Sequence, residues 1–255
     1  MKNKLLFLIL AIGFFSCESD RDDNISSTAV QFRWQHHWDN TPVTNADFNS
    51  IKFTNAFGNS LSIERLRYLI SKITFTKPSG ETLTLDGYNL IDLGDPESLQ
   101  FTPETSIELG SYSNISFVFG FSNEDNEDGA YPDLNSASWN VPAMLGGGYH
   151  YMQLDGKYIN TSNSEVGYNY HAIRAADNPG ANPSFPQDTF FQVDLGAISI
   201  TDNSTITIAM NIAQWFKEPY SWDLNVYDQM LMPNSAAQIL MYQNGQNAFN
   251  LVSVE

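Results

Sequence analysis

The chain contains a single cysteine, Cys17, among its 255 residues. Without a second cysteine, the fold has no disulfide framework and no cluster of thiolates that could hold a structural metal. Its stability must therefore come from a hydrophobic core. The about 235 residues that follow Cys17 are enough for one large β domain, because such domains reach roughly 200 to 250 residues.

Basic residues are also scarce, since 12 lysines and arginines stand against 29 aspartates and glutamates, which gives a formal net charge of -17. Phosphate recognition needs basic patches, so nucleic acid is excluded as a partner, whereas cations or a basic protein would be attracted. The sequence also lacks a Gly-x-Ser-x-Gly elbow, a phosphate-binding loop and a His-Glu-x-x-His helix. These absences favour a binding protein over an enzyme.

No long apolar run is available for a membrane span. The apolar run at residues 5–15 follows Lys2 and Lys4. It is too short to cross a bilayer as a helix, because a membrane span takes roughly 18 residues or more. Residues 1–16 are therefore predicted to be a secretory signal peptide. Cys17 follows the small Ser16 and is the expected lipid-attachment site. Residues 17–27 then form an acidic tether and residues 28–255 the mature domain. We expect an envelope lipoprotein anchored to the outer membrane, on its periplasmic side or at the cell surface.

Alternation of apolar and polar residues dominates the rest of the chain. At residues 30–38 the apolar positions and His36 share one face, which indicates a strand with one buried side. Further strands are predicted at residues 62–76, 82–93, 112–121, 149–158, 165–171, 190–195 and 205–212, and short helices at residues 213–217 and 235–244. The sequence therefore predicts an all-β, single-domain antiparallel β-sandwich with one or two short helices and long loops at residues 122–148 and 172–189.

Three of the four histidines fall on predicted strands or strand ends. His36 faces inward, His150 alternates in phase with the apolar Met152, and His171 ends its strand beside a loop. Imidazole suits copper or zinc, so convergence of these three rings would make a metal site, with soft sulfur from Met144 and Met152 if the metal is Cu(I). The alternative is that each inward histidine is a hydrogen-bonded core residue.

An acidic stretch at residues 122–129 carries a fragment of a calcium-loop pattern. Glu124, Asn126 and Asp128 stand at alternate positions before Gly129, but the twelfth position is Asn135 where a calcium loop has glutamate. A solvated acidic loop is therefore the favoured interpretation, with calcium as the alternative.

Several segments resemble the MbnP-like proteins. These segments are FRWQHHWD at residues 32–39, LRYLISKI at 66–73, YNLID at 88–92, FVFGF at 117–121, YPDLN at 131–135 and MLGGGYHYMQLDG at 144–156, followed by Tyr170-His171 and Trp215-Phe216. The resemblance spans nearly the whole mature chain. The family comprises copper-binding proteins of the periplasm or outer membrane, and the lipoproteins of a Bacteroidetes-like branch are the most similar.

The resemblance implies copper held by histidines together with a tryptophan oxidised to kynurenine by a di-haem cytochrome c peroxidase-like partner. Trp34-x-His36 resembles the family's Trp-x-His arrangement, and His171 resembles a histidine in the second half of the family sequence. His150 is similar to a histidine of the Bacteroidetes-like branch, where methanobactin-associated members carry another residue.

These observations predict an envelope lipoprotein that binds copper for handling or storage. The expected ligands are His36, His150 and His171, with Trp34 as the oxidised tryptophan and a pocket lined by Trp38, Met144 and Met152. An alternative from another class is an accessory lipoprotein that binds a glycan or a protein through an aromatic surface, since aromatic residues make up 13% of the chain.

Overall fold

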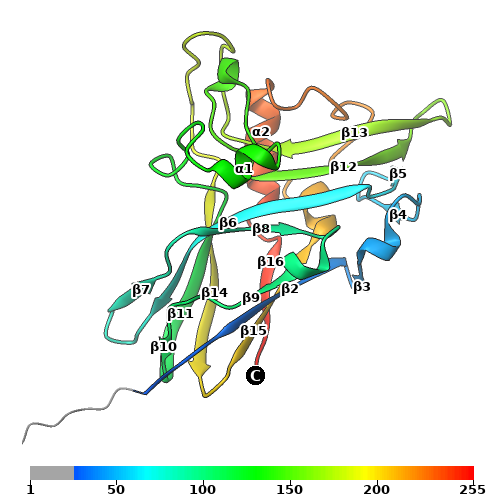
Figure 1. Ribbon diagram of the computed structural model, residues 1–255. Helices are drawn as coiled ribbons and strands as arrows, with labels where there is room; N and C mark the ends of the chain where they lie inside the picture. Colours follow the sequence, from blue (N-terminus) through cyan, green and yellow to red (C-terminus); the bar gives the residue numbers. More distant parts are fainter. Residues whose placement is uncertain (1–25) are drawn as a thin grey trace, which may run out of the picture.

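A computed structural model describes residues 26–255, in which a large and a small β-sheet face each other (Figure 1). The predicted signal peptide and Cys17 lie outside the described residues. Within residues 26–255, no helix is both long and apolar enough to span a bilayer.

The large sheet has nine strands and is built around the long strand β6. Residues 65–68 of β6 pair with β12, whereas residues 70–76 pair with β11, so β6 joins the two groups of strands. Within the part that pairs with β11, Lys72 has a positive φ at a shift in register, and a bulge of this kind bends the strand. Its strands are β4 Phe53–Thr54, β5 Ser60–Leu61, β6 Arg65–Thr76, β7 Thr82–Thr84, β8 Tyr88–Asp92, β11 Gly110–Phe119, β12 Met152–Ile159, β13 Glu165–Ala172 and β14 Phe191–Ile200.

The small sheet has five strands, and its centre is the pair formed by β2 and β15. This pair is parallel, although the other pairs in both sheets are antiparallel, so the prediction of an antiparallel sandwich holds except at this one junction. Its strands are β2 Gln31–Trp38, β3 Thr41–Pro42, β9 Gln100–Phe101, β15 Thr205–Asn211 and β16 Phe249–Val254, while β1 Ser27–Thr28 and β10 Ile107–Glu108 form a separate pair.

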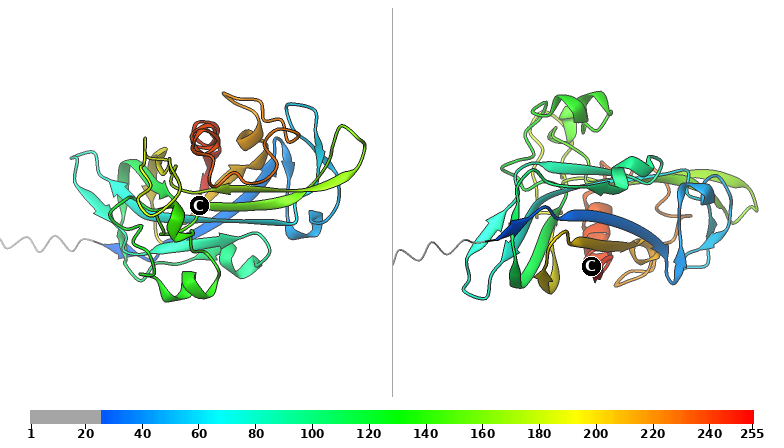
Figure 2. Two further views of the ribbon diagram at one scale, coloured as in Figure 1. Left: turned by 90° about the horizontal axis from the view of Figure 1, so that it is seen from above. Right: turned by 60° about the horizontal axis from the view of Figure 1, so that its bottom comes forward.

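The predicted helices are both present, and short helical turns occur in the loops (Figures 1 and 2). The helix α2 begins where the Asn234 side chain accepts a hydrogen bond from the Ala237 N–H, which caps its first turn. The helical segments are α1 Pro132–Ser136 and α2 Ser235–Gly245, with single 3₁₀ turns η1 Asn45–Asp47, η2 Pro96–Leu99, η3 Ala143–Leu145 and η4 Ile212–Phe216.

Aromatic side chains from both sheets fill the space between them. Trp34 of β2 packs edge-on against Tyr68 and Phe117 of the large sheet, with ring centroids 6.0 and 5.3 Å apart. Alternate residues of β2 are buried and its other residues face outward, as the period of two predicts. Burial of these large side chains contributes about 1.5–3 kcal/mol each, which replaces the disulfides that the chain lacks.

Gly156 of β12 lies where the chain of residue 62 crosses closely above the strand. An added Cβ at this position would fall 2.1 Å from the Ser62 carbonyl oxygen, which is backbone and cannot rotate away. We therefore expect Gly156→Ala to lower the free energy of unfolding in urea by about 1–3 kcal/mol. Gly167→Ala on the neighbouring strand is the control, because its Cβ would meet nothing closer than 3.8 Å. Equal stability of the two variants would contradict the prediction.

Candidate metal centre

Two histidine rings meet at the ends of β12 and β13. The ring centroids of His150 and His171 are 5.3 Å apart, and the rings are nearly perpendicular at 82°. His171 lies opposite Gln153 in the antiparallel pair, and His150 precedes β12. A bend at Tyr151 breaks the alternation of the strand, so the expectation that His150 would face the same side as Met152 is wrong. This bend allows His150 to approach His171.

Each ring is held by a hydrogen bond at one nitrogen. Nδ1 of His150 lies 2.8 Å from the carbonyl oxygen of Trp139, and Nε2 of His171 lies 2.8 Å from Oδ1 of Asp155. Both oxygens accept, so each of these two nitrogens donates. The nitrogen that remains on each ring, Nε2 of His150 and Nδ1 of His171, is the one available to a metal. Histidines that bind metals in proteins are fixed by hydrogen bonds of this kind.

The free nitrogen of His150 faces a thioether. Nε2 of His150 is 3.2 Å from Sδ of Met232, and burial lowers the pKa of His150 to about 4, so the ring is neutral at physiological pH. A neutral ring that donates through Nδ1 has no proton on Nε2, and a thioether has none to give. Two lone-pair donors therefore face each other with no hydrogen atom between them. A soft cation bound to both would resolve this contact.

Asp155 fixes the orientation of His171 through a network on the outer face of the large sheet. Its Oδ1 also accepts a hydrogen bond from Asn169, at 2.6 Å, and its Oδ2 accepts one from Nε of Arg65, at 2.6 Å. Burial opposes ionisation of this carboxyl, but the hydrogen bonds from His171 and Asn169 and the charge of Arg65 outweigh it and hold its pKa at about 2. Asp155 is therefore an anion that anchors the imidazole.

The loop that carries Met232 is tied to β13 by a buried amide. Gln238 of α2 donates from Nε2 to the carbonyl oxygens of Leu231 and His171, at 3.0 and 2.9 Å, and its Oε1 accepts from the Ile173 N–H at 2.8 Å. One side chain thus fixes the segment before α2, orange in Figure 1, against the end of β13. His171 and Met232 are held together by this scaffold. We refer to His150, His171 and Met232 as the His–Met cluster.

The acidic loop that carries the calcium-like pattern holds the backbone of the residues just before His150. Oδ1 of Asn126 accepts a hydrogen bond from the Tyr149 N–H at 2.8 Å, and Oδ1 of Asp128 accepts one from the Gly148 N–H at 3.1 Å. Gly148 has a φ of +78°, and a Cβ there would lie 2.6 Å from Asn126. The Oδ1 atoms of Asn126 and Asp128 are thus engaged by backbone N–H groups, and calcium binding by Glu124, Asn126 and Asp128 stays an expectation.

A cavity of about 440 Å³ opens beside the cluster, and we call it the methionine pocket. It is lined by His171 and by side chains from two segments distant in sequence. These are Pro142, Met144 and Leu145 on one side, and Met230, Leu231, Met232 and Pro233 on the other, with Asn169 beside His171. Met144, predicted to line a pocket near the histidines, is placed there.

His36 does not join the other two histidines. Met152 and Gln153 are neighbours in β12, so their side chains point to opposite faces of the large sheet. Gln153 is paired with His171, whereas Met152 lies opposite Ala172 and Tyr68. Tyr68 points to the inner face, where its hydroxyl is 3.1 Å from Nε2 of His36. The sheet therefore separates His36 from His171, and the prediction of a three-histidine cluster is wrong.

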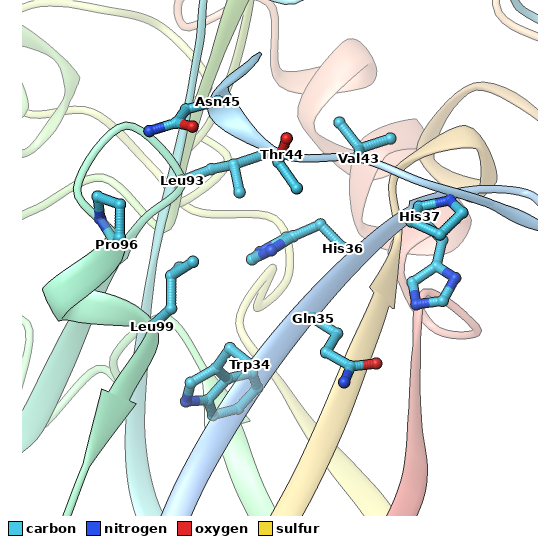
Figure 3. Close-up of a pocket in the computed structure, with 11 residues that line it drawn as sticks. Trp34, Gln35, His36, His37, Val43, Thr44, Asn45, Leu93, Pro96 and Leu99 are labelled. Carbon is cyan, nitrogen blue, oxygen red and sulfur yellow. The ribbon is translucent and has the colours of Figure 1, made fainter. Parts of the chain in front are cut away.

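His36 lines a different cavity of about 480 Å³ near the start of the chain. Figure 3 shows its imidazole projecting from β2 toward Leu93 and Leu99, with His37 on the other side of the strand. Burial, and then the charge of His37, lowers the pKa of His36 to about 3. His36 is therefore a neutral core residue.

The predicted tryptophans and Met152 also lie away from the His–Met cluster. Trp34 packs in the core, and Trp38 stacks on Phe53 with ring centroids 4.9 Å apart. Trp139, which the sequence did not single out, has its ring centroid 5.7 Å from that of His150 and its indole nitrogen buried without a hydrogen-bond partner. The tryptophan next to the histidine pair is therefore Trp139.

The donor set fits one soft metal ion. Bonds of about 2 Å to one nitrogen of each ring would place the two centroids within about 6 Å of each other, and the observed separation is 5.3 Å. Among residues 26–255 no group of three or more histidine, cysteine, aspartate or glutamate side chains could hold a metal. The further donor beside His150 is the thioether of Met232, and a set of imidazole and thioether donors suits Cu(I).

Comparisons with known proteins identify the family and the fold of the chain. The sequence profile of MbnP matches residues 27–234, which is most of the chain. The chain belongs to the MbnP family. The solved structure of MbnP from Methylosinus trichosporium has the same fold, with a TM-score of 0.53 over 78% of this chain and 81% of that chain, at 12% sequence identity. No curated protein matches the chain in sequence.

Family membership confirms the resemblance read from the sequence, and the shared fold covers 78% of this chain and 81% of the relative. At 12% identity the solved relative supports the fold alone, whereas the candidate site of this chain follows from its own geometry. That geometry adds Met232, Asp155, Trp139 and Gln238 to the site that the sequence predicted. The short Met-Leu-Met run at residues 230–232, just before Pro233, was the one sequence signal that pointed to the missing sulfur.

Proposed function

We propose that this protein binds copper as Cu(I) in the cell envelope, through Nε2 of His150, Nδ1 of His171 and Sδ of Met232. The observation that carries the proposal is the 3.2 Å contact between two lone-pair donors, Nε2 of His150 and Sδ of Met232. Bonds of about 2.0 Å to nitrogen and 2.3 Å to sulfur at a tetrahedral angle put such donors roughly 3.5 Å apart. The protein holds the ion and catalyses no reaction on it.

The oxidised tryptophan that the family resemblance implies fits Trp139 better than Trp34. Trp139 packs against His150, and Arg67 lies 5.0 Å above its ring, whereas Trp34 lies between the two sheets. A di-haem peroxidase-like partner would carry out this oxidation. Mass spectrometry of the peptide that contains Trp139, from protein made in its native host, tests this assignment.

The signal peptide and Cys17 support attachment of the protein to the outer membrane by a lipid. The competing idea of an aromatic binding surface loses its strongest candidates, because all five tryptophans are buried. Labelling of the protein with a fatty acid in the host, with Cys17→Ser as control, tests the anchor.

Anaerobic titration with Cu(I) against a chromogenic chelator tests the copper site. We expect one Cu(I) per chain, with nitrogen and sulfur neighbours in the X-ray absorption spectrum, and a loss of affinity of at least about 100-fold in the His150→Ala/His171→Ala variant. Met232→Leu should remove the sulfur signal. His36→Gln is the discriminating control, because the structure separates His36 from the cluster.

Retention of stoichiometric Cu(I) by His36→Gln and its loss in His150→Ala/His171→Ala are the expected pattern. The reverse pattern, or a wild-type protein that takes up no copper, would contradict the proposal. Unfolding curves of each variant show whether a loss of binding comes from a loss of fold.

A further inference from the structure

The methionines of this chain fall into two groups. Three of the six methionines at described positions, which are Met152, Met210 and Met241, are fully buried in the core. The other three, Met144, Met230 and Met232, line the methionine pocket. Packing explains the first group, since methionine is a good filler of apolar gaps. It does not explain Met144 and Met230, which are exposed.

Two of the pocket methionines are exposed to solvent. The exposed fraction of Met144 is 55%, and that of Met230 is 78%. An apolar side chain gains about 1.5–3 kcal/mol from full burial, so an exposed methionine gives up most of this stabilisation. Met144 belongs to η3 and Met230 to the loop before α2, so two separate segments bring thioethers to one opening.

The backbone at Met230 is also strained. Its φ is +57°, in the left-handed region that costs a residue with a side chain about 1–2 kcal/mol. The neighbouring chain is fixed on both sides, by the Asp228 carbonyl oxygen that accepts from the Asn169 N–H at 2.8 Å and by the bond from Gln238 to Leu231. The surrounding structure therefore imposes the conformation that presents Met230 at the rim. Strain of this kind gathers at functional sites.

The lining of the pocket favours a soft monovalent ion over other metals. No carboxylate or amine lines it, and the only titratable side chain among the lining residues is His171. Thioethers are neutral, soft ligands that bind Cu(I) well, whereas Zn²⁺ and Cu²⁺ prefer nitrogen and oxygen donors. A neutral opening lined by thioethers therefore favours Cu(I) over divalent metal ions.

We propose that Met144 and Met230 form an entry site that captures Cu(I) at the rim of the methionine pocket and passes it to the His–Met cluster. This inference rests on the copper site proposed above. In this proposal the two exposed methionines set the rate at which Cu(I) is taken up, and the His–Met cluster sets the affinity for the bound ion. The same thioethers set the preference of the route for Cu(I).

The test follows transfer of Cu(I) from its bicinchoninate complex to the purified apo-protein, without oxygen, by the loss of the chelator's absorbance. In Met144→Leu/Met230→Leu, which keeps the size and apolarity of both side chains, we expect the rate constant of uptake to fall by about tenfold or more. The equilibrium affinity should change by less than about threefold, because the ligands of the cluster remain. Ag(I) should be slowed in the same way.

Met152→Leu is the matched control, since it removes a sulfur on the inner face of the large sheet. It should load at the wild-type rate. The single variants Met144→Leu and Met230→Leu give intermediate rates if both thioethers take part, and they keep the test valid if the double variant folds poorly.

Uptake at an unchanged rate in the double variant would overturn the entry site and leave the copper site standing. A parallel fall of rate and affinity would also overturn it, since the methionines would then be ligands of the bound ion. A wild-type protein that removes no Cu(I) from the chelator would overturn the copper site and the entry site together.

Discussion

Acidification from pH 7 to about pH 4 is expected to lower the free energy of unfolding by several kcal/mol, and His36 is the largest single cause. Burial, with the charge of His37, lowers the pKa of His36 to about 3 in the folded protein, against 6.5 for an ordinary histidine. Below pH 6.5, His36 therefore binds a proton in the unfolded chain but not in the folded chain. Stability must fall as the pH falls through this window.

The size of the effect follows from the width of that window. Each pH unit between the two pKa values costs about 1.4 kcal/mol, so His36 contributes a loss of roughly 3 kcal/mol by about pH 4. His150 acts in the same sense, because burial lowers its pKa to about 4. Asp155, with a pKa of about 2, loses its contribution only at more acidic pH, below the ordinary range of a carboxyl.

Urea unfolding at a series of pH values measures this dependence. His36→Gln should flatten the curve by roughly 3 kcal/mol between pH 7 and about pH 4, because glutamine does not titrate. His37→Gln, the next residue on the opposite face of β2, should leave the curve nearly as steep as in the wild type. A curve in His36→Gln as steep as that of the wild type would show that His36 is not held neutral in the fold.

The sequence predicted the strands well, because a single buried face imposes a period of two on each of them. The alternation at residues 30–38 became β2 with alternate burial, and the helix predicted at residues 235–244 is α2. The region predicted as one strand at residues 82–93 is two, β7 and β8, because Gly87 takes a φ of +84° in the turn between them.

The site was harder to predict than the fold. Alternation shows which residues of one strand share a face, but it does not show which side of the sheet that face takes in the finished fold. His36 and His171 were both placed correctly in their strands, and the large sheet still separates them. Met232 and Trp139 reach the cluster through loops whose course depends on long-range hydrogen bonds, such as those of Gln238, which no local pattern reveals.

Replacement of Asp155 by asparagine is expected to weaken Cu(I) binding by about 10- to 100-fold, although Asp155 does not bind the ion in our proposal. The carboxylate accepts hydrogen bonds from His171, Asn169 and Arg65 at once. An asparagine oxygen can replace only one side of the carboxylate, and its NH₂ group would face a donor. The His171 ring would lose its fixed orientation and part of its basicity, which is how residues behind a ligand tune metal affinity.

Arg65→Gln separates this effect from the ion pair. Oδ1, which accepts from His171, is not the oxygen that contacts Arg65, so the variant should bind Cu(I) within about threefold of the wild type. The Arg65 side chain is 45% exposed, so solvent screens the pair and its loss should cost only about 1 kcal/mol of stability. Chelator competition gives the affinity of each variant, and urea unfolding gives its stability. An equal loss of affinity in Arg65→Gln and Asp155→Asn would mean that the network as a whole, rather than the carboxylate on His171, sets the strength of binding.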